Sequence, residues 1–136
     1  MRRLWRLVFL LQILVPAIAA AAEQSIFVEL NAAEAAENRC RLTFLIHNRR
    51  DSGLDTLKLD MALFDRDGII YRRMATELGP VRADKTNVRA FLLDGNCEQI
   101  GSVLVNDVTA CGPGDAGACI DALELASRVK GVRFYK

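Results

Sequence analysis

The sequence has few of the residues on which metal sites, redox centres and many enzymes depend. Its 136 residues include one histidine, three methionines and 7% aromatic residues. No C-x-x-C spacing occurs, which removes the usual thiol-exchange motif, and the cysteines do not form the two close pairs of a Cys₄ zinc site. No G-x-S-x-G motif, phosphate-binding glycine loop or pair of catalytic carboxylates is recognisable. We therefore expect no metal, no cofactor and no catalytic residues.

The chain also lacks a strong charge bias and a long apolar run. It has 18 Lys and Arg against 17 Asp and Glu, and three of the basic residues (Arg2, Arg3 and Arg6) lie at the extreme N-terminus. The remainder is slightly acidic, so we expect no binding to nucleic acid. The apolar stretch 7–22 contains Gln12 and Pro16 and falls short of the roughly 20 apolar residues that a membrane-spanning helix needs.

The N-terminus has the pattern of a bacterial export signal. Three arginines precede the apolar stretch, and four consecutive alanines, Ala19 to Ala22, end it. Small residues at this place are typical of a cleavage site. We predict a cleaved signal peptide over 1–22 and a single domain over 23–136, with no stable membrane anchor after cleavage. An uncleaved anchor is the alternative, and the sequence leaves both Sec and Tat export open. The predicted location is the periplasm of a Gram-negative bacterium, or the medium.

Alternating apolar and polar residues predict a series of short strands. In 40–47, Cys40, Leu42, Phe44 and Ile46 share one face, so we expect Cys40 to point inward. An Asp-Gly pair at Asp67-Gly68 favours a tight hairpin turn. The predicted strands are 25–30, 40–47, 57–63, 69–73, 86–93 and 100–108, and the last two are apolar on both faces, which is typical of central strands.

Four segments are less regular. The Ala- and Glu-rich stretch 31–39, with a capping-box spacing of Asn31 and Glu34, favours one helical turn. We expect a short edge strand in 74–81, ended by Gly79-Pro80, and a glycine-rich loop over 111–119. The tail from 120 suits either a helix or two strands, and we favour two strands. The predicted fold is an all-β, immunoglobulin-like antiparallel β-sandwich.

Four cysteines in a small exported domain indicate two disulfides. Of the three possible pairings we favour Cys111 with Cys119, because an eight-residue step closes at little entropic cost. Cys40 then pairs with Cys97. In the loop-closure model the two bridges contribute roughly 2.5 and 4 kcal/mol, the longer loop more.

Three stretches together resemble a family of small exported alphaproteobacterial proteins, often labelled Tat pathway signal sequence domain proteins. They are VELNAAEAAENRCRLTFLIHN (28–48), IGSVLVNDVTAC (100–111) and LELASR (123–128). The resemblance would span most of the chain behind the signal and all four cysteines, and it implies no activity. Separately, LDMALFDRDGII (59–70) resembles the hairpin of FxLYD-type immunoglobulin-like domains.

Two hypotheses about function follow. The first is a non-enzymatic binding or accessory module of the cell envelope with an unidentified protein partner, contacted through the loops 51–56 or 111–119. The alternative is a small hydrolase or metal-dependent enzyme that uses His47 with a nearby carboxylate, Asp60 or Asp65. The sequence does not set the oligomeric state.

Overall fold

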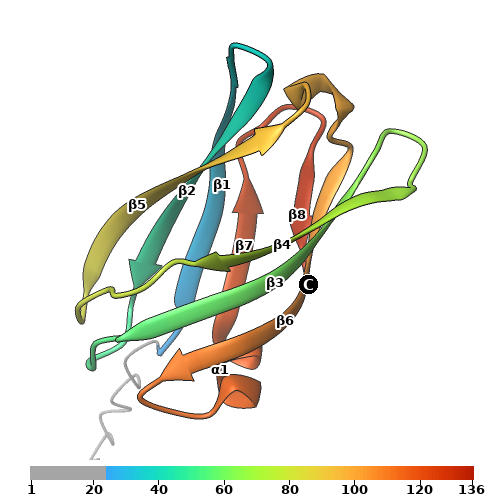
Figure 1. Cartoon of the computed structure of the whole chain (residues 1–136). Coiled ribbons are helices and arrows are strands. Elements are labelled where there is room, and N and C mark those ends of the chain that lie inside the picture. Colours follow the sequence, from blue (N-terminus) through green and yellow to red (C-terminus); the bar gives the residue numbers. More distant parts are fainter. Residues whose placement is uncertain (1–23) are drawn as a thin grey trace, which may run out of the picture.

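The strands form two four-stranded sheets packed face to face (Figure 1). The structure is a computed structural model that describes residues 24–136, so the predicted signal peptide lies outside the described residues. One sheet has the order β5 (Lys85–Asp94), β2 (Arg39–Asn48), β1 (Ile26–Ala36) and β7 (Leu123–Ser127). The other has the order β4 (Ile70–Glu77), β3 (Thr56–Phe64), β6 (Ser102–Gly112) and β8 (Arg133–Tyr135). A 3₁₀ turn, η1 (Cys97–Gln99), and one short helix, α1 (Ala116–Ala122), complete the elements.

This arrangement confirms the predicted all-β, immunoglobulin-like sandwich, with one difference in strand direction. Neighbours in β5-β2-β1 and in β4-β3-β6 are antiparallel, as expected. The outer pairs β1–β7 and β6–β8 are parallel. After β6 the chain crosses by α1 to the other sheet, where β7 runs alongside β1, and β8 then returns beside β6. No helix within 24–136 is long and apolar enough to cross a bilayer.

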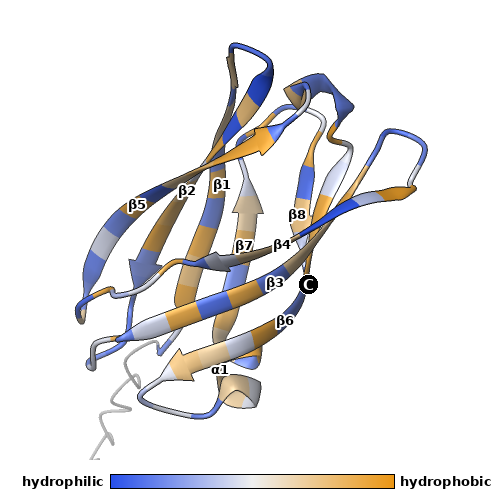
Figure 2. Cartoon of the chain, in the orientation of Figure 1, coloured by the Kyte–Doolittle hydropathy of each residue, from blue (hydrophilic) through white to orange (hydrophobic). Residues whose placement is uncertain are grey.

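The core lies between the sheets and follows the period-two pattern of the sequence. In β2, Leu42, Phe44 and Ile46 are fully buried, and the residues between them face outward. The Phe44 ring packs against Phe91 of β5 and Phe134 of β8, with ring centroids 6.0 and 5.6 Å apart. Figure 2 shows the same alternation of apolar and polar residues along the strands. Each fully buried side chain of this kind contributes about 1.5–3 kcal/mol of transfer free energy.

The predicted helical turn over 31–39 is wrong. β1 continues to Ala36, and its second half pairs with the start of β2 in a hairpin that turns at Glu37 and Asn38. A register shift between Leu30 and Ala32 marks a bulge in the middle of β1. Backbone pairing along the hairpin outweighs the modest helix preference of Ala and Glu, because that preference is only a few tenths of a kcal/mol per residue.

The prediction that 86–93 is a central strand is also wrong. β5 lies at the edge of its sheet, and among residues 24–136 it pairs with β2 alone. Its inward residues Phe91 and Leu93 contribute to the core, whereas Val88 and Leu92 on the outer face are exposed. The apolar residues on the second face are therefore solvent-facing and do not indicate burial.

The remaining segments differ in detail from the expectation. The predicted return strand and edge strand over 69–81 are one continuous strand, β4, which ends before Gly79-Pro80. The predicted loop 111–119 contains the first turn of α1, whose N-cap Asp115 accepts hydrogen bonds from the backbone N–H groups of Gly117 and Ala118. The tail forms two strands after α1, as favoured.

Candidate functional site

Both predicted disulfides are present. Cys40 at the start of β2 is bonded to Cys97 of η1, and Cys111 near the end of β6 is bonded to Cys119 of α1, with Cα–Cα distances of 5.0 and 6.4 Å. No cysteine within 24–136 is free. Two bonded pairs indicate an oxidising, non-cytoplasmic compartment. In the same residues no group of three or more His, Cys, Asp or Glu side chains is placed to hold a metal ion.

The two loops predicted to contact a partner lie side by side at one end of the sandwich. The backbone N–H of Asp55 donates to the carbonyl oxygen of Gly112 at 2.6 Å. Leu54 and Val81 form an antiparallel bridge with two 2.8 Å hydrogen bonds, which ties in the β4–β5 connection as well. We call the residues 49–55, 78–84 and 112–115 the end-loop surface. It lies at the foot of the sandwich in Figure 1.

One buried amide fixes the shape of this surface. Asn48, the last residue of β2, is fully buried, and its Nδ2 donates to the carbonyl oxygens of Ser52, Val81 and Arg82 at 2.9, 3.2 and 3.3 Å. Its Oδ1 accepts from the backbone N–H of Arg50 at 3.2 Å. Two loops far apart in sequence are thereby bound to the same side chain. Sequence reasoning missed Asn48, although an amide between an apolar strand and a polar loop is a usable signal.

A pocket of about 280 Å³ opens beside the end-loop surface. Two charged residues line it: Arg50, whose guanidinium lies 3.8 Å from Sγ of Cys119, and Asp115, whose carboxylate caps α1. A cation and an anion thus face the same pocket. The lining residues are Gln24, Arg50, Gly114, Asp115, Ala118, Cys119 and Ala122.

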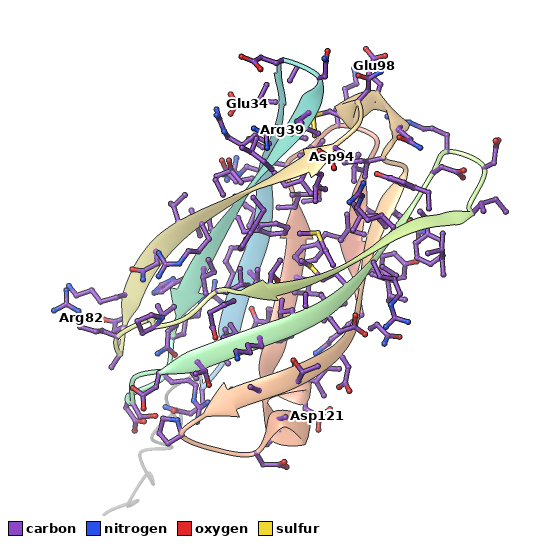
Figure 3. The ribbon with its side chains drawn as sticks, in the orientation of Figure 1. Glu34, Arg39, Arg82, Asp94, Glu98 and Asp121 are labelled. Carbon is purple, nitrogen blue, oxygen red and sulfur yellow. A yellow bond between two sulfur atoms is a disulfide. The ribbon has the colours of Figure 1, made fainter. Side chains whose placement is uncertain are left out.

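The exposed charges of the end-loop surface are mainly acidic. Its exposed charged residues are Asp51, Asp55, Arg82, Asp84 and Asp115, while Arg49 and Arg50 are half-buried, Arg49 in an ion pair with Glu124. Figure 3 places Arg82 at this end, and Glu34, Arg39 and Glu98 at the opposite end of the sandwich. The acidic loops at one end are therefore separated from the charges of the β1–β2 hairpin by the length of the strands.

The structure does not bring His47 together with the carboxylates predicted to assist it. His47 lies on β2 and faces outward from its sheet, whereas Asp60 lies on β3 of the other sheet. Asp65 is in the β3–β4 turn, where its Oδ1 accepts from the N–H groups of Asp67 and Ile69 at 2.9 Å. His47 instead has a carboxylate that sequence reasoning did not select, because Nε2 lies 3.5 Å from Oδ1 of Asp84.

Asp60 belongs to a polar cluster on the outer face of the second sheet. Its Oδ2 accepts from the Arg73 guanidinium and, at 2.7 Å, from the Asn106 amide. Register shifts in the β3–β6 pairing lie on both sides of Asp60, opposite Asp107. Because strand bulges move a side chain out of simple alternation, spacing in the sequence does not reveal this cluster.

The fold and its bridges define a class of protein, an immunoglobulin-like β-sandwich with two disulfides. No family model matches the chain, and no curated protein matches it. Among solved structures it is similar to IrmA from Escherichia coli, with a TM-score of 0.56. The match covers 74% of this chain and 90% of that chain, at 15% sequence identity. At this identity the likeness concerns the fold.

Proposed function

We propose that this protein is an exported, non-enzymatic binding module of the cell envelope, and that it contacts a protein partner through the end-loop surface. The observation that carries the proposal is the convergence of two loops, 49–55 and 78–84, on Asn48, which holds exposed polar residues in one fixed arrangement. Binding residues are often found on loops that a rigid scaffold positions.

The rigidity of these loops favours a binding role. Residues 49–55 are joined to 78–84 by the Leu54–Val81 bridge and to 112–115 by the Asp55–Gly112 hydrogen bond. The Cys111–Cys119 bridge adds a covalent constraint beside them. Since ordering a loop on binding costs free energy, loops that are already fixed leave more of the contact energy for affinity.

The chemistry of the partner follows from the exposed charges. Four of the five exposed charged residues on the end-loop surface are carboxylates. Opposite potentials favour encounter and correct register between two proteins. We therefore propose a partner that presents a basic patch. The periplasm is the proposed compartment, supported by the two disulfides and by the signal predicted over 1–22.

A pair of matched double variants tests the proposal. Asp51→Lys with Asp55→Lys reverses two charges on the end-loop surface, and Glu34→Lys with Glu98→Lys makes the same change at the opposite end (Figure 3). Each variant is expressed in the periplasm of the bacterium that encodes the protein. It is then cross-linked to its neighbours, and the proteins that co-purify with it are quantified by mass spectrometry. We expect the first variant to lose a partner that the second retains. If both variants capture the same proteins in the same amounts as the unchanged chain, the end-loop surface is not the binding site.

The alternative, a small hydrolase, has one supporting observation, the 3.5 Å approach of His47 to Asp84. A carboxylate can orient an imidazole that acts as a general base. Hydrolysis of ester or phosphoester test substrates by the purified protein, abolished by His47→Gln, would favour the enzyme over the binding module. Equal hydrolysis rates for the unchanged protein and His47→Gln would exclude the hydrolase hypothesis.

A further inference from the structure

The free edge of β5 is the longest regular edge in the sandwich. β5 pairs with β2 over ten residues without a register shift, and no strand within 24–136 pairs with its other side. The other three sheet edges are shorter or irregular. β7 has five residues and β8 has three, and β4 has a register shift in its pairing with β3.

The backbone groups on this edge can be assigned from the hydrogen bond that follows the strand. Gly95 donates its N–H to the carbonyl oxygen of Asn38, one step beyond the Arg39–Asp94 pair. Because hydrogen-bonding direction alternates along an antiparallel strand, the odd-numbered residues of β5 bond to β2. The even-numbered residues direct N–H and C=O toward the free edge, and they are Thr86, Val88, Ala90, Leu92 and Asp94.

The side chains of the same residues make this edge unusually apolar. Val88 is 57% exposed and Leu92 is 43% exposed, and Ala90 between them is also exposed. Natural edge strands are usually protected by proline, bulges or charges. The β5 edge has one such protecting charge: Arg89 donates to the carbonyl oxygens of Gly79 and, at 3.3 Å, of Val88, whose C=O faces the free edge, so pairing with a second strand exchanges this bond for one from the second strand.

We propose that β5 pairs with β5 of a second copy of this chain, antiparallel, about a two-fold axis at Ala90. The two first sheets would then join into one continuous eight-stranded sheet. An isologous contact of this kind closes on itself and needs one self-complementary strand. The proposal goes beyond the binding function above and does not depend on it.

The sequence of β5 is self-complementary in this register. On the outer face, Val88 lies opposite the partner's Leu92, and the two Ala90 residues meet at the axis. On the inner face, Arg89 lies opposite the partner's Phe91, a pairing of a guanidinium with an aromatic ring that is favourable. Both strands are paired over the whole of 86–94. Apolar cross-strand pairs of this kind stabilise a sheet.

Neighbouring registers are less favourable. Moving the axis to Arg89 places two arginines directly opposite each other, which destabilises a strand pair. Moving it to Phe91 leaves Thr86 unpaired and places Val88 opposite the partner's Asp94. If one strand shifts by a single residue relative to the other, side chains that face inward on one strand lie opposite side chains that face outward on the other. The register centred on Ala90 is therefore selected.

The dimer has a consequence for the end-loop surface. Since the two β5 strands run in opposite directions, the end-loop surfaces of the two copies face opposite ends of the joined sheet. A dimer would thus present two separate recognition surfaces and could bridge two partners.

Proline substitutions test the pairing. In Ala90→Pro the lost N–H is one that faces the free edge, so the β2–β5 pairing is preserved. Ala75→Pro is the matched control: Leu78 donates to Leu57, so by the same alternation the N–H of Ala75 faces the free edge of β4.

Light scattering and sedimentation of the processed, disulfide-bonded protein give the dimer dissociation constant. We expect Ala90→Pro to raise it at least about tenfold, because two hydrogen bonds at the axis are lost. Ala75→Pro should leave it unchanged. The proposal is overturned if the unchanged protein stays monomeric at all concentrations up to about 1 mM, because a millimolar dissociation constant is the weak limit of association. Equal dissociation constants for the two variants would also overturn it.

Cysteine cross-linking tests the register. Residues that form a hydrogen-bonded antiparallel pair have Cα atoms about 5.5 Å apart, within the range of a disulfide. Ala90→Cys alone should give a cross-linked dimer on mild oxidation. Val88→Cys mixed with Leu92→Cys should cross-link, and each of these alone should not. Cross-linking of Val88→Cys with Ala90→Cys in preference to these combinations would place the axis at Arg89 and overturn the assigned register.

Discussion

Removing the Cys40–Cys97 bridge should cost more stability than removing the Cys111–Cys119 bridge. The first closes a sequence separation of 57 residues and the second a separation of 8. In the loop-closure model the entropy lost by the unfolded chain grows with the logarithm of loop length. The corresponding stabilisations are about 4 kcal/mol for Cys40–Cys97 and about 2.5 kcal/mol for Cys111–Cys119. Either is a large share of the roughly 5–15 kcal/mol by which domains are stable.

Two double variants measure the difference directly. In Cys40→Ala with Cys97→Ala the short bridge remains, and in Cys111→Ala with Cys119→Ala the long bridge remains. Urea unfolding of each oxidised protein, followed by fluorescence and circular dichroism, gives its free energy of unfolding. Losses of about 4 and 2.5 kcal/mol are expected. Equal losses, or a larger loss for the short bridge, would refute the reasoning from loop length.

Three further predictions concern single positions. Asn48→Ala should lower the free energy of unfolding by about 1–3 kcal/mol, because three carbonyl oxygens lose their donor, and hydrogen exchange should speed up in 50–55 and 81–84. Gly101→Ala would place a Cβ 2.3 Å from the carbonyl oxygen of Asp65 and should cost about 1–3 kcal/mol, whereas Gly53→Ala, with no atom nearer than 3.8 Å, should cost less than half of that. Burial raises the pKa of Tyr71, with Arg72 opposing and Asp65 adding to the shift, so stability should fall as the pH rises above about 10, and Tyr71→Phe should flatten that fall in urea titrations.

The features that local chemistry determines could be predicted from the sequence. The alternation in 40–47 and 57–63 predicted strands whose inward residues are buried, because side chains alternate between the faces of any strand. The cysteine pairing followed from the short step between Cys111 and Cys119, which left one pairing for the other two.

The features that depend on neighbours in space could not be predicted in this way. Whether β5 is central or at an edge depends on the order of strands in the sheet, which hydropathy does not encode. The stretch 31–39 has the composition of a helix and forms a strand because β2 offers it a continuous partner. The role of Asn48 depends on three carbonyl groups, two of which lie more than thirty positions away.

The central claim is that this β-sandwich functions outside the cytoplasm with both of its disulfides formed. Intact mass and non-reducing peptide mapping of the protein recovered from fractionated cells test it most directly. We expect a periplasmic chain that begins between residues 21 and 23, has no free thiol and contains the 40–97 and 111–119 linkages. A full-length chain in the cytoplasmic fraction with four reduced cysteines would contradict the claim.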